Sequence, residues 1–322
     1  MTYKFRHQLR FAITALLLAG LVASCSKNDI LSSPDTDSLE IDFSTPSLSR
    51  GVVTSSNDMS AFDVWGWYSP TSATGTATQV FDARKVTNTG SGWKYDIPER
   101  WQQGNIYRFY AVYPSAGNES KYKTASCTES GNLTITNFDC SHAVDLMTAS
   151  EEVECPENGY PGKVTMKFSH ELAKLNFIVK SENTIATITS FKVYGVNYKG
   201  TLTKSSTATW NQVTTATQDK TPYTYTDSFE FNTTNGWEKD IFGDVLLIPD
   251  SDLKDAKLEI TYKYPGETDG ATTSVIDLET SQSPSWVAGQ SYKYTLTIKG
   301  GSLSVNVTVN PWDGKDTSVS WE

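Results

Sequence analysis

The chain has 322 residues, of which 38% are hydrophobic, 12% aromatic and 20% charged, and its formal net charge is −10. This mixture excludes collagen, coiled coils and proteins with many membrane spans, and it holds too much apolar material for a chain that is disordered throughout. The negative charge excludes a general binder of nucleic-acid backbones, which needs a basic surface. The length allows one large domain or two, and the composition is typical of a β-rich extracellular protein.

Residues 1–24 have the pattern of an export signal. Three basic residues and no acid precede residues 11–23, an apolar run of 13 residues. A membrane-spanning helix needs about 20 residues, so the run predicts a secretory signal. The segment Leu21–Cys25 resembles the lipobox of bacterial lipoproteins, in which the cysteine receives a lipid. An ordinary signal peptide, with Cys25 incidental, is the alternative.

Residues 25–38 are polar and aperiodic, which predicts a flexible tether. From Leu39 onward, apolar and polar residues alternate over short stretches that Gly, Asn, Asp and Pro separate. Residues 106–113 are largely apolar on both faces and predict a central strand. Helical periodicity is nearly absent, so the predicted fold class is all-β. The other main predicted strands are 39–43, 133–138, 164–168, 175–179, 191–196, 245–248, 258–264, 292–298 and 303–309.

The many short strands predict β-sandwiches. The segment Cys155–Gly162 holds two Pro and two Gly in eight residues, so we place a domain boundary there. We therefore expect an N-terminal sandwich over residues 39–158 and a C-terminal sandwich over residues 159–322.

Besides Cys25, three cysteines follow the signal segment. An exported chain meets an oxidising environment, in which one pair could close. Cys127 and Cys140 flank a predicted strand and are the candidate disulfide, which leaves Cys155 as the odd thiol. The spacings match no metal-binding motif, so we predict no metal site and no cofactor.

No catalytic motif stands out in the sequence. HExxH, GxSxG, the P-loop and GxGxxG are all absent, and only His142 and His170 remain after the signal segment. We therefore predict no catalytic residues and a protein that is not an enzyme.

The nine tryptophans suggest a second function. Most are expected in the cores, but an exposed indole can stack on a sugar ring or anchor an interface. The alternative function is thus a monomeric surface lipoprotein that binds glycans through exposed aromatics.

Arg50 is the only basic residue between Lys27 and Arg84, and it stands in a Ser/Thr-rich stretch. This composition predicts a protease-accessible loop, whereas a solvent-exposed arginine in a linker is the alternative. Cleavage between Arg50 and Gly51 would remove an alternating strand and open a groove that another chain could fill. The displaced strand would carry Leu39, Ile41 and Phe43.

Taken together, these features and several short motifs resemble the fimbrillin family, which comprises the type V pilins and related lipoproteins. The resemblance extends over nearly the whole chain, and the order and spacing of the motifs carry it. The motifs are Phe62–Tyr68, Trp101–Pro114, Val144–Ala149, Val164–Phe177, Leu246–Pro249, Gly289–Leu296 and Val307–Trp312.

The resemblance implies two tandem transthyretin-like Greek-key β-sandwich domains and export to the outer membrane, with a lipid on Cys25. It implies cleavage at Arg50–Gly51 by an Arg-specific protease and then donor-strand exchange with other pilin subunits. The resulting fimbrium would serve adhesion to a host protein or glycan receptor. Some family members are anchor or tip subunits that are not cleaved or not polymerised. The implied donor strand carries Leu303, Val305, Val307 and Val309; the alternative is that this strand completes its own domain.

Overall fold

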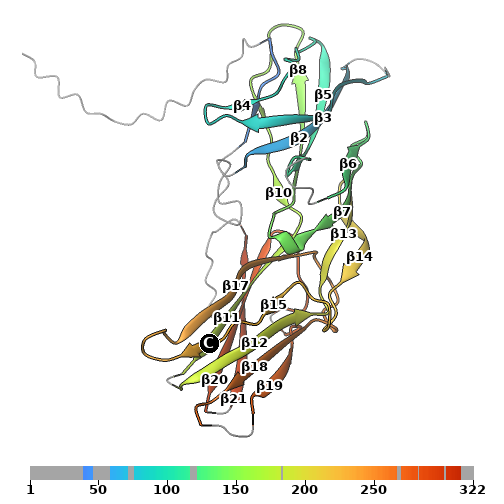
Figure 1. The fold of residues 1–322 in the computed structure, drawn as a ribbon. Coiled ribbons are helices and arrows are strands. Elements are labelled where there is room, and N and C mark those ends of the chain that lie inside the picture. The colour runs from blue at the N-terminus through green and yellow to red at the C-terminus, as the bar shows by residue number, and fades with distance from the viewer. Residues whose placement is uncertain are drawn as a thin grey trace, which may run out of the picture. The chain divides into compact units, whose positions relative to one another are not determined.

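The computed structural model describes residues 39–45, 59–71, 76–116, 122–182, 184–266, 270–281, 283–300 and 302–312. Over these residues the chain forms β-strands and one 3-10 turn, η1 (Cys140–His142) (Figure 1). The prediction of an all-β fold is confirmed.

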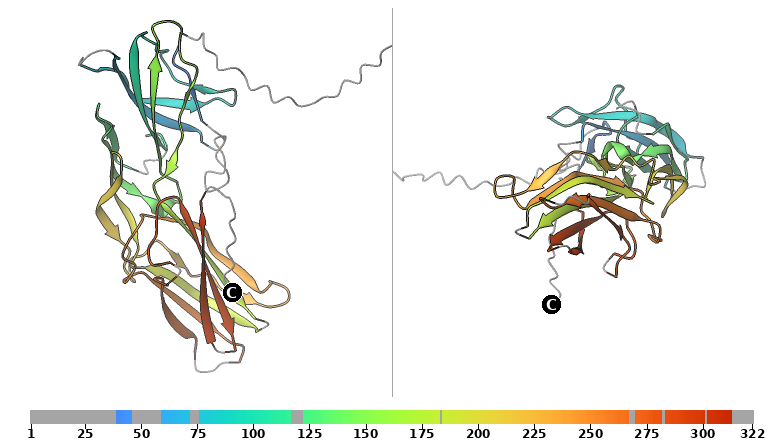
Figure 2. Two further views of the ribbon diagram at one scale, coloured as in Figure 1. Left: turned by 180° about the vertical axis from the view of Figure 1, so that it is seen from behind. Right: turned by 60° about the horizontal axis from the view of Figure 1, so that its bottom comes forward.

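The strands of the described part form five sheets (Figures 1 and 2). In chain order they are β1 (Phe43–Ser44), β2 (Ala61–Pro70), β3 (Thr78–Asn88), β4 (Trp93–Lys94), β5 (Asn105–Tyr113), β6 (Thr124–Cys127), β7 (Leu133–Asp139), β8 (Met147–Cys155), β9 (Val164–Thr165), β10 (Ser169–His170), β11 (Ala173–Ser181), β12 (Ala186–Tyr194), β13 (Asn197–Lys204), β14 (Ala208–Thr215), β15 (Thr224–Tyr225), β16 (Phe229–Phe231), β17 (Glu238–Leu247), β18 (Lys257–Lys263), β19 (Thr272–Asp277), β20 (Gln290–Lys299) and β21 (Ser302–Pro311).

The first half of the chain builds an antiparallel sheet in the order β10-β8-β5-β2-β3-β4. β5 pairs with β2 on one side and β8 on the other, as its two apolar faces predicted. The adjacent β2 is also buried on both faces. Phe62 and Val64 enter one core, whereas Trp65 and Trp67 enter another. Successive side chains of a strand point to opposite faces, so the even- and odd-numbered residues of β2 enter two different cores.

The second half builds a sandwich from two sheets, β17-β11-β20-β21 and β15-β12-β18-β19, with β16 also paired to β12. β11 and β20 run parallel, and the other pairs of these sheets are antiparallel. Alternate side chains of the inner strands fill the space between the sheets, as period-two patterning requires. They include Leu175, Phe177, Val179, Phe191, Val193, Leu258, Ile260, Tyr294, Leu296 and Ile298.

A third core connects strands from both halves of the chain. The sheet β14-β13-β7-β6 pairs β7 with β13, and β9 and β10 pair back onto β1 and β8. Strands before and after residue 158, near the predicted domain boundary, therefore share sheets, because the chain crosses between its two halves more than once.

Candidate functional site

The segment 39–45 is hydrogen-bonded along its first edge to residues near position 100. The main-chain nitrogen of Ile41 donates to the carbonyl oxygen of Glu99 at 2.9 Å, and that of Trp101 donates to the carbonyl oxygen of Leu39 at 3.0 Å. The Tyr95 hydroxyl donates to the carbonyl oxygen of Ile41 at 2.6 Å. This edge is therefore anchored by residues far along the chain.

The second edge of the segment pairs with β9 in parallel. The main-chain nitrogen of Val164 donates to the carbonyl oxygen of Asp42 at 2.8 Å, and that of Met166 donates to the carbonyl oxygen of Ser44 at 2.8 Å. The hydroxyls of Ser44 and Thr165 lie 3.1 Å apart. The segment is thus paired on both sides, as an inner strand is, although only two of its residues form regular β1.

The structure buries two of the three side chains predicted for this segment. Ile41 and Phe43 are 0% and 3% exposed, whereas Leu39 is 37% exposed. Phe43 enters a cage of aromatic rings whose centroids lie 5.5 to 6.1 Å from its own, mostly in edge-to-face contact. The rings belong to Phe62, Phe81, Tyr95 and Phe109.

The predicted donor strand is β21, at the edge of the sheet β17-β11-β20-β21. It pairs with β20 over its whole length. Val307 is buried in the core of the second sandwich, and Leu303 and Val305 pack against that core, whereas Val309 is 37% exposed. In this structure β21 completes its own sheet, with one hydrogen-bonded edge and three of its four alternating side chains turned inward.

A polar cluster at the end of β10 contacts Trp312, the residue after β21. His170 Nδ1 lies 2.6 Å from Asp145 Oδ2, and the imidazole stacks on the indole of Trp312. Burial raises the pKa of Asp145, and the hydrogen bond with His170 opposes that rise. The sequence predicted no role for Asp145. Its signal is a lone acid inside the apolar run Ala143–Met147.

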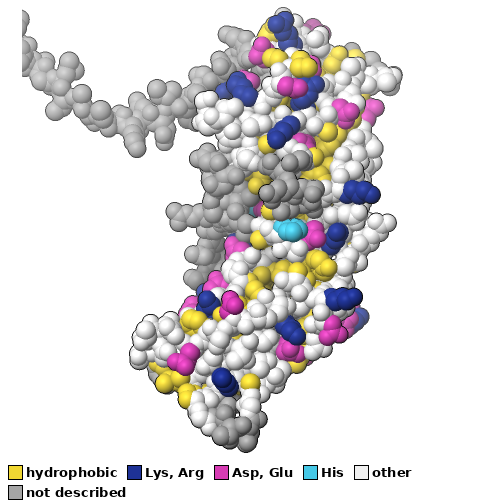
Figure 3. All heavy atoms as spheres, in the orientation of Figure 1, with side chains coloured by type: hydrophobic (Ala, Val, Ile, Leu, Met, Phe, Trp, Pro, Cys, Tyr) yellow, Lys and Arg dark blue, Asp and Glu magenta, His cyan; other side chains and the backbone are white. Residues whose placement is uncertain are grey.

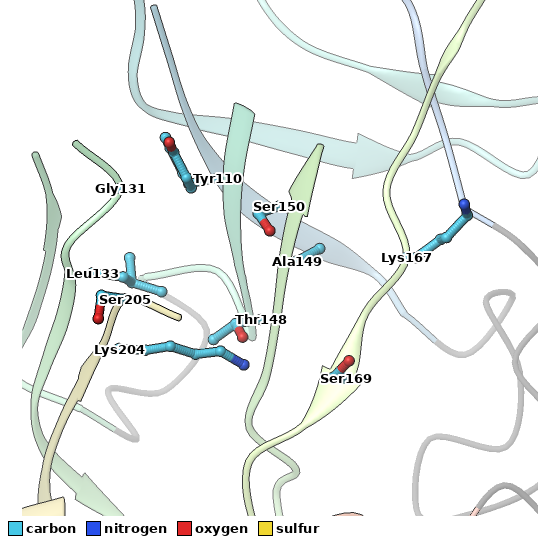
Figure 4. A pocket seen from close by; sticks show the side chains of 10 residues that line it. All are labelled: Tyr110, Gly131, Leu133, Thr148, Ala149, Ser150, Lys167, Ser169, Lys204 and Ser205. Carbon is cyan, nitrogen blue, oxygen red and sulfur yellow. The ribbon is translucent and has the colours of Figure 1, made fainter. Parts of the chain in front are cut away.

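A second buried acid, Glu171, accepts hydrogen bonds from two neighbouring side chains. Its carboxylate accepts hydrogen bonds from the Thr148 hydroxyl at 2.5 Å and from the Lys204 ammonium. Lys204 reaches toward Thr148 across a hollow of about 290 Å³ (Figure 4). The lining residues are Tyr110, Gly131, Leu133, Thr148, Ala149, Ser150, Lys167, Ser169, Lys204 and Ser205.

The candidate disulfide is not formed, because Cys127 and Cys140 are both free. In the antiparallel pair of β6 and β7, Cys127 lies opposite Leu133, at one end of β7. Cys140 follows the other end of β7, which puts the two cysteines roughly 20 Å apart at about 3.3 Å per residue. A disulfide requires Cα atoms within about 7 Å. Two cysteines that flank a strand in sequence therefore lie at its opposite ends and are not close in space.

Three predicted site residues, Cys25, Arg50 and Gly51, lie outside the described residues. Nothing in the structure therefore bears on the lipid or on the cleavage site.

The tryptophans that the structure describes are buried or half-buried. Trp65 and Trp67 both enter the third core. Among the described residues, the exposed large hydrophobic side chains are all aliphatic. The glycan-binding alternative therefore finds no exposed aromatic platform in this part of the chain.

The described residues contain no group of three or more His, Cys, Asp or Glu side chains that could hold a metal ion. Over the same ranges, no helix has the length and apolar character needed to cross a membrane. Acidic and basic side chains are interspersed on the face in Figure 3, which shows no continuous basic patch.

Comparison with known proteins adds a family and a fold. A family model described as Fimbrillin-like matches residues 50–312. A protein of Bacteroides uniformis named "Putative fimbrium subunit Fim1C" is 28% identical over 169 residues, which cover 52% of this chain and 51% of that protein. The chain thus spans about half the length of this curated relative.

Two solved structures match most of this chain in the structural comparison. A fimbrial protein from Bacteroides vulgatus has a TM-score of 0.55 at 18% identity, over 85% of this chain and 99% of that one. A "putative cell adhesion protein" from Bacteroides uniformis has a TM-score of 0.47 at 17% identity, over 85% of this chain and 100% of that one.

Proposed function

This chain belongs to the fimbrillin-like family, and on that premise we propose that it is a structural or accessory subunit of a cell-surface fimbrium that serves adhesion. In this proposal it is exported to the outer membrane as a lipoprotein, cut by an Arg-specific protease and assembled with other subunits by donor-strand exchange. The family is one of structural and adhesion proteins, not of enzymes.

The observation that carries the proposal is the way segment 39–45 is held. It is paired on both edges and fills the aromatic cage with Phe43, and it precedes Arg50 in the chain. Cleavage after Arg50 would leave it held by non-covalent contacts alone. Its departure would leave main-chain groups unpaired on two sides and open an apolar groove. A strand from another subunit could pair with these main-chain groups and fill the groove.

β21 is the proposed donor. Its alternating Leu303, Val305, Val307 and Val309 match the period of the departing strand. Burying four such side chains contributes on the order of 6 to 12 kcal/mol before ordering costs, from roughly 1.5 to 3 per side chain. Within the described part of the chain β21 is paired along one edge, so it can leave its sheet by breaking a single ladder.

Treatment with an Arg-specific protease tests the proposal. We expect a stable core that begins at Gly51 and that forms denaturation-resistant ladders on gels. Arg84 and Arg108 lie in β3 and β5 and make ion pairs at 2.9 Å, so they should resist cleavage. A dominant cut at either of them, or a core that stays at one band, would count against processing and exchange.

A double substitution separates the donor role of β21 from its role in its own domain. Val305→Asp with Val307→Asp puts two charges against the C-terminal core, so we expect it to detach the edge strand β21, leave the rest of the processed monomer folded and abolish the ladders. Ser304→Asp with Thr308→Asp adds the same charge on the solvent face and should leave them intact. If the first variant simply unfolds while the control folds, the strand belongs to its own core and the donor role fails.

The lipid anchor rests on the sequence around Cys25. Labelling with a palmitate analogue should mark the wild-type chain, and Cys25→Ala should abolish the label and leave unprocessed precursor. Ser24→Ala keeps the cysteine and should still be labelled. A Cys25→Ala chain that is labelled and sediments with membranes would refute the anchor.

A further inference from the structure

Trp312, directly after β21, is the most deeply buried side chain of the terminal segment 302–312. It is 1% exposed, against 8% for Val307 and 37% for Val309. Among the described strands, β21 pairs with β20. Beyond the end of β21, the indole of Trp312 occupies a further buried site, which we call the seat.

The seat is built by His170, the last residue of β10, and by Lys174 near the start of β11. The rings of His170 and Trp312 stack with centroids 4.1 Å apart and planes within 4°. Lys174 Nζ lies 5.3 Å from the indole centroid, within cation–π range. Asp145, whose side chain is fully buried, holds the imidazole through Nδ1. The indole thus stacks on the His170 imidazole, whose orientation is fixed by its hydrogen bond with Asp145.

The main chain reinforces this seat. The nitrogen of Trp312 donates to the carbonyl oxygen of Gly289 at 2.8 Å, and the nitrogen of Gly289 donates to the carbonyl oxygen of Leu172 at 2.9 Å. Gly289 has φ of +72°, a conformation that favours glycine. Backbone and indole therefore attach the end of β21 to the same stretch of chain.

The seat also contains two polar atoms whose hydrogen bonding is not satisfied. Within the described residues, Trp312 Nε1 and Asp145 Oδ1 are buried without a hydrogen-bond partner. A buried donor without an acceptor weakens the state that contains it. The indole is therefore held by stacking and packing rather than by a saturated set of hydrogen bonds, which suits a contact that must be able to open.

We infer that Trp312 is a clasp: it positions β21 in its own sheet, and its release from the His170 seat makes β21 available to another subunit. The second half of this inference rests on the proposed function. Trp312 acts through β21 and is a positioning residue.

Hydrogen exchange of the unprocessed chain tests the clasp without any assembly. In Trp312→Ala we expect the β21 amides to exchange at least about tenfold faster, while those of β11 and β12 keep wild-type rates, because the strand opens locally. Trp312→Phe keeps a ring to stack and should restore most of the protection. Trp210→Ala removes a tryptophan that packs against the same core from β14 and should leave β21 protected.

Two outcomes distinguish a failure of the clasp role of Trp312 from a failure of the donor role of β21. Unchanged β21 exchange in Trp312→Ala would overturn the clasp, whatever the chain assembles into. Faster β21 exchange with wild-type ladder formation after processing would keep the positioning role and overturn the donor role of β21. If Trp312→Ala speeds exchange in every strand, the double variant His170→Ala with Asp145→Ala removes the stacking ring without leaving a buried acid unpaired, and the same criterion on β21 applies.

Discussion

Replacing Phe43 with alanine is expected to lower the free energy of unfolding of the unprocessed chain by about 3 to 5 kcal/mol, the usual range for a buried phenylalanine. The side chain is 3% exposed and contacts four aromatic rings that are themselves held in strands or by hydrogen bonds. The cage therefore cannot collapse around the smaller side chain, and a cavity remains. Urea denaturation measures the loss.

Leu39→Ala is the matched control, because it shortens a side chain of the same segment that is 37% exposed. Its expected effect is within about 0.5 kcal/mol. After cleavage, Phe43→Ala should also release the segment faster and speed ladder formation, since the segment is then held by non-covalent contacts alone. A loss below about 1 kcal/mol for Phe43→Ala would show that the segment is not a structural strand.

The strands could be predicted from sequence because period-two alternation reports directly on a pleated, half-buried backbone. Residues 303–309 alternate strictly and form most of β21. Residues 106–113 are apolar on both faces, and β5 lies between two other strands with cores on both sides. Local pattern and global environment agree at these positions.

Other features depend on which strands become neighbours, and alternation does not encode that. The pairing of β7 with β13 joins residues 60 to 71 positions apart in sequence, on either side of the expected boundary at residue 158. The register of β6 against β7 separates Cys127 from Cys140. Leu39 continues the alternation of Ile41 and Phe43, yet it lies beyond the covered core and stays exposed.

Only the part of the candidate site that depends on local alternation could be predicted from the sequence. The segment of Ile41 and Phe43 follows from local pattern, and the structure places it in a core. The seat of Trp312 brings together Asp145, His170 and a residue more than 140 positions later. Such a contact leaves only an indirect mark in the sequence, a charged or ring-bearing residue inside an otherwise apolar motif.

The second large effect is expected at Lys204. Its ammonium donates to Glu171, whose side chain is 3% exposed and which also accepts from Thr148 of β8. Lys204→Met would leave a buried carboxylate with the Thr148 hydroxyl as its remaining side-chain partner. Removing one partner of a buried ion pair costs about 3 to 5 kcal/mol, because the other charge is left uncompensated. Urea denaturation at neutral pH should show a loss of that size.

Glu171→Gln is the informative counterpart, because it removes the charge and keeps an acceptor for Thr148. Lys204 is 25% exposed, so its ammonium can turn to water, and the expected loss is smaller, about 1 to 2 kcal/mol. The double variant should be more stable than Lys204→Met alone, since no buried charge then lacks a partner. If Lys204→Met costs no more than Glu171→Gln, the carboxylate is solvated and the two residues do not form a buried pair between β13 and the connection from β10 to β11.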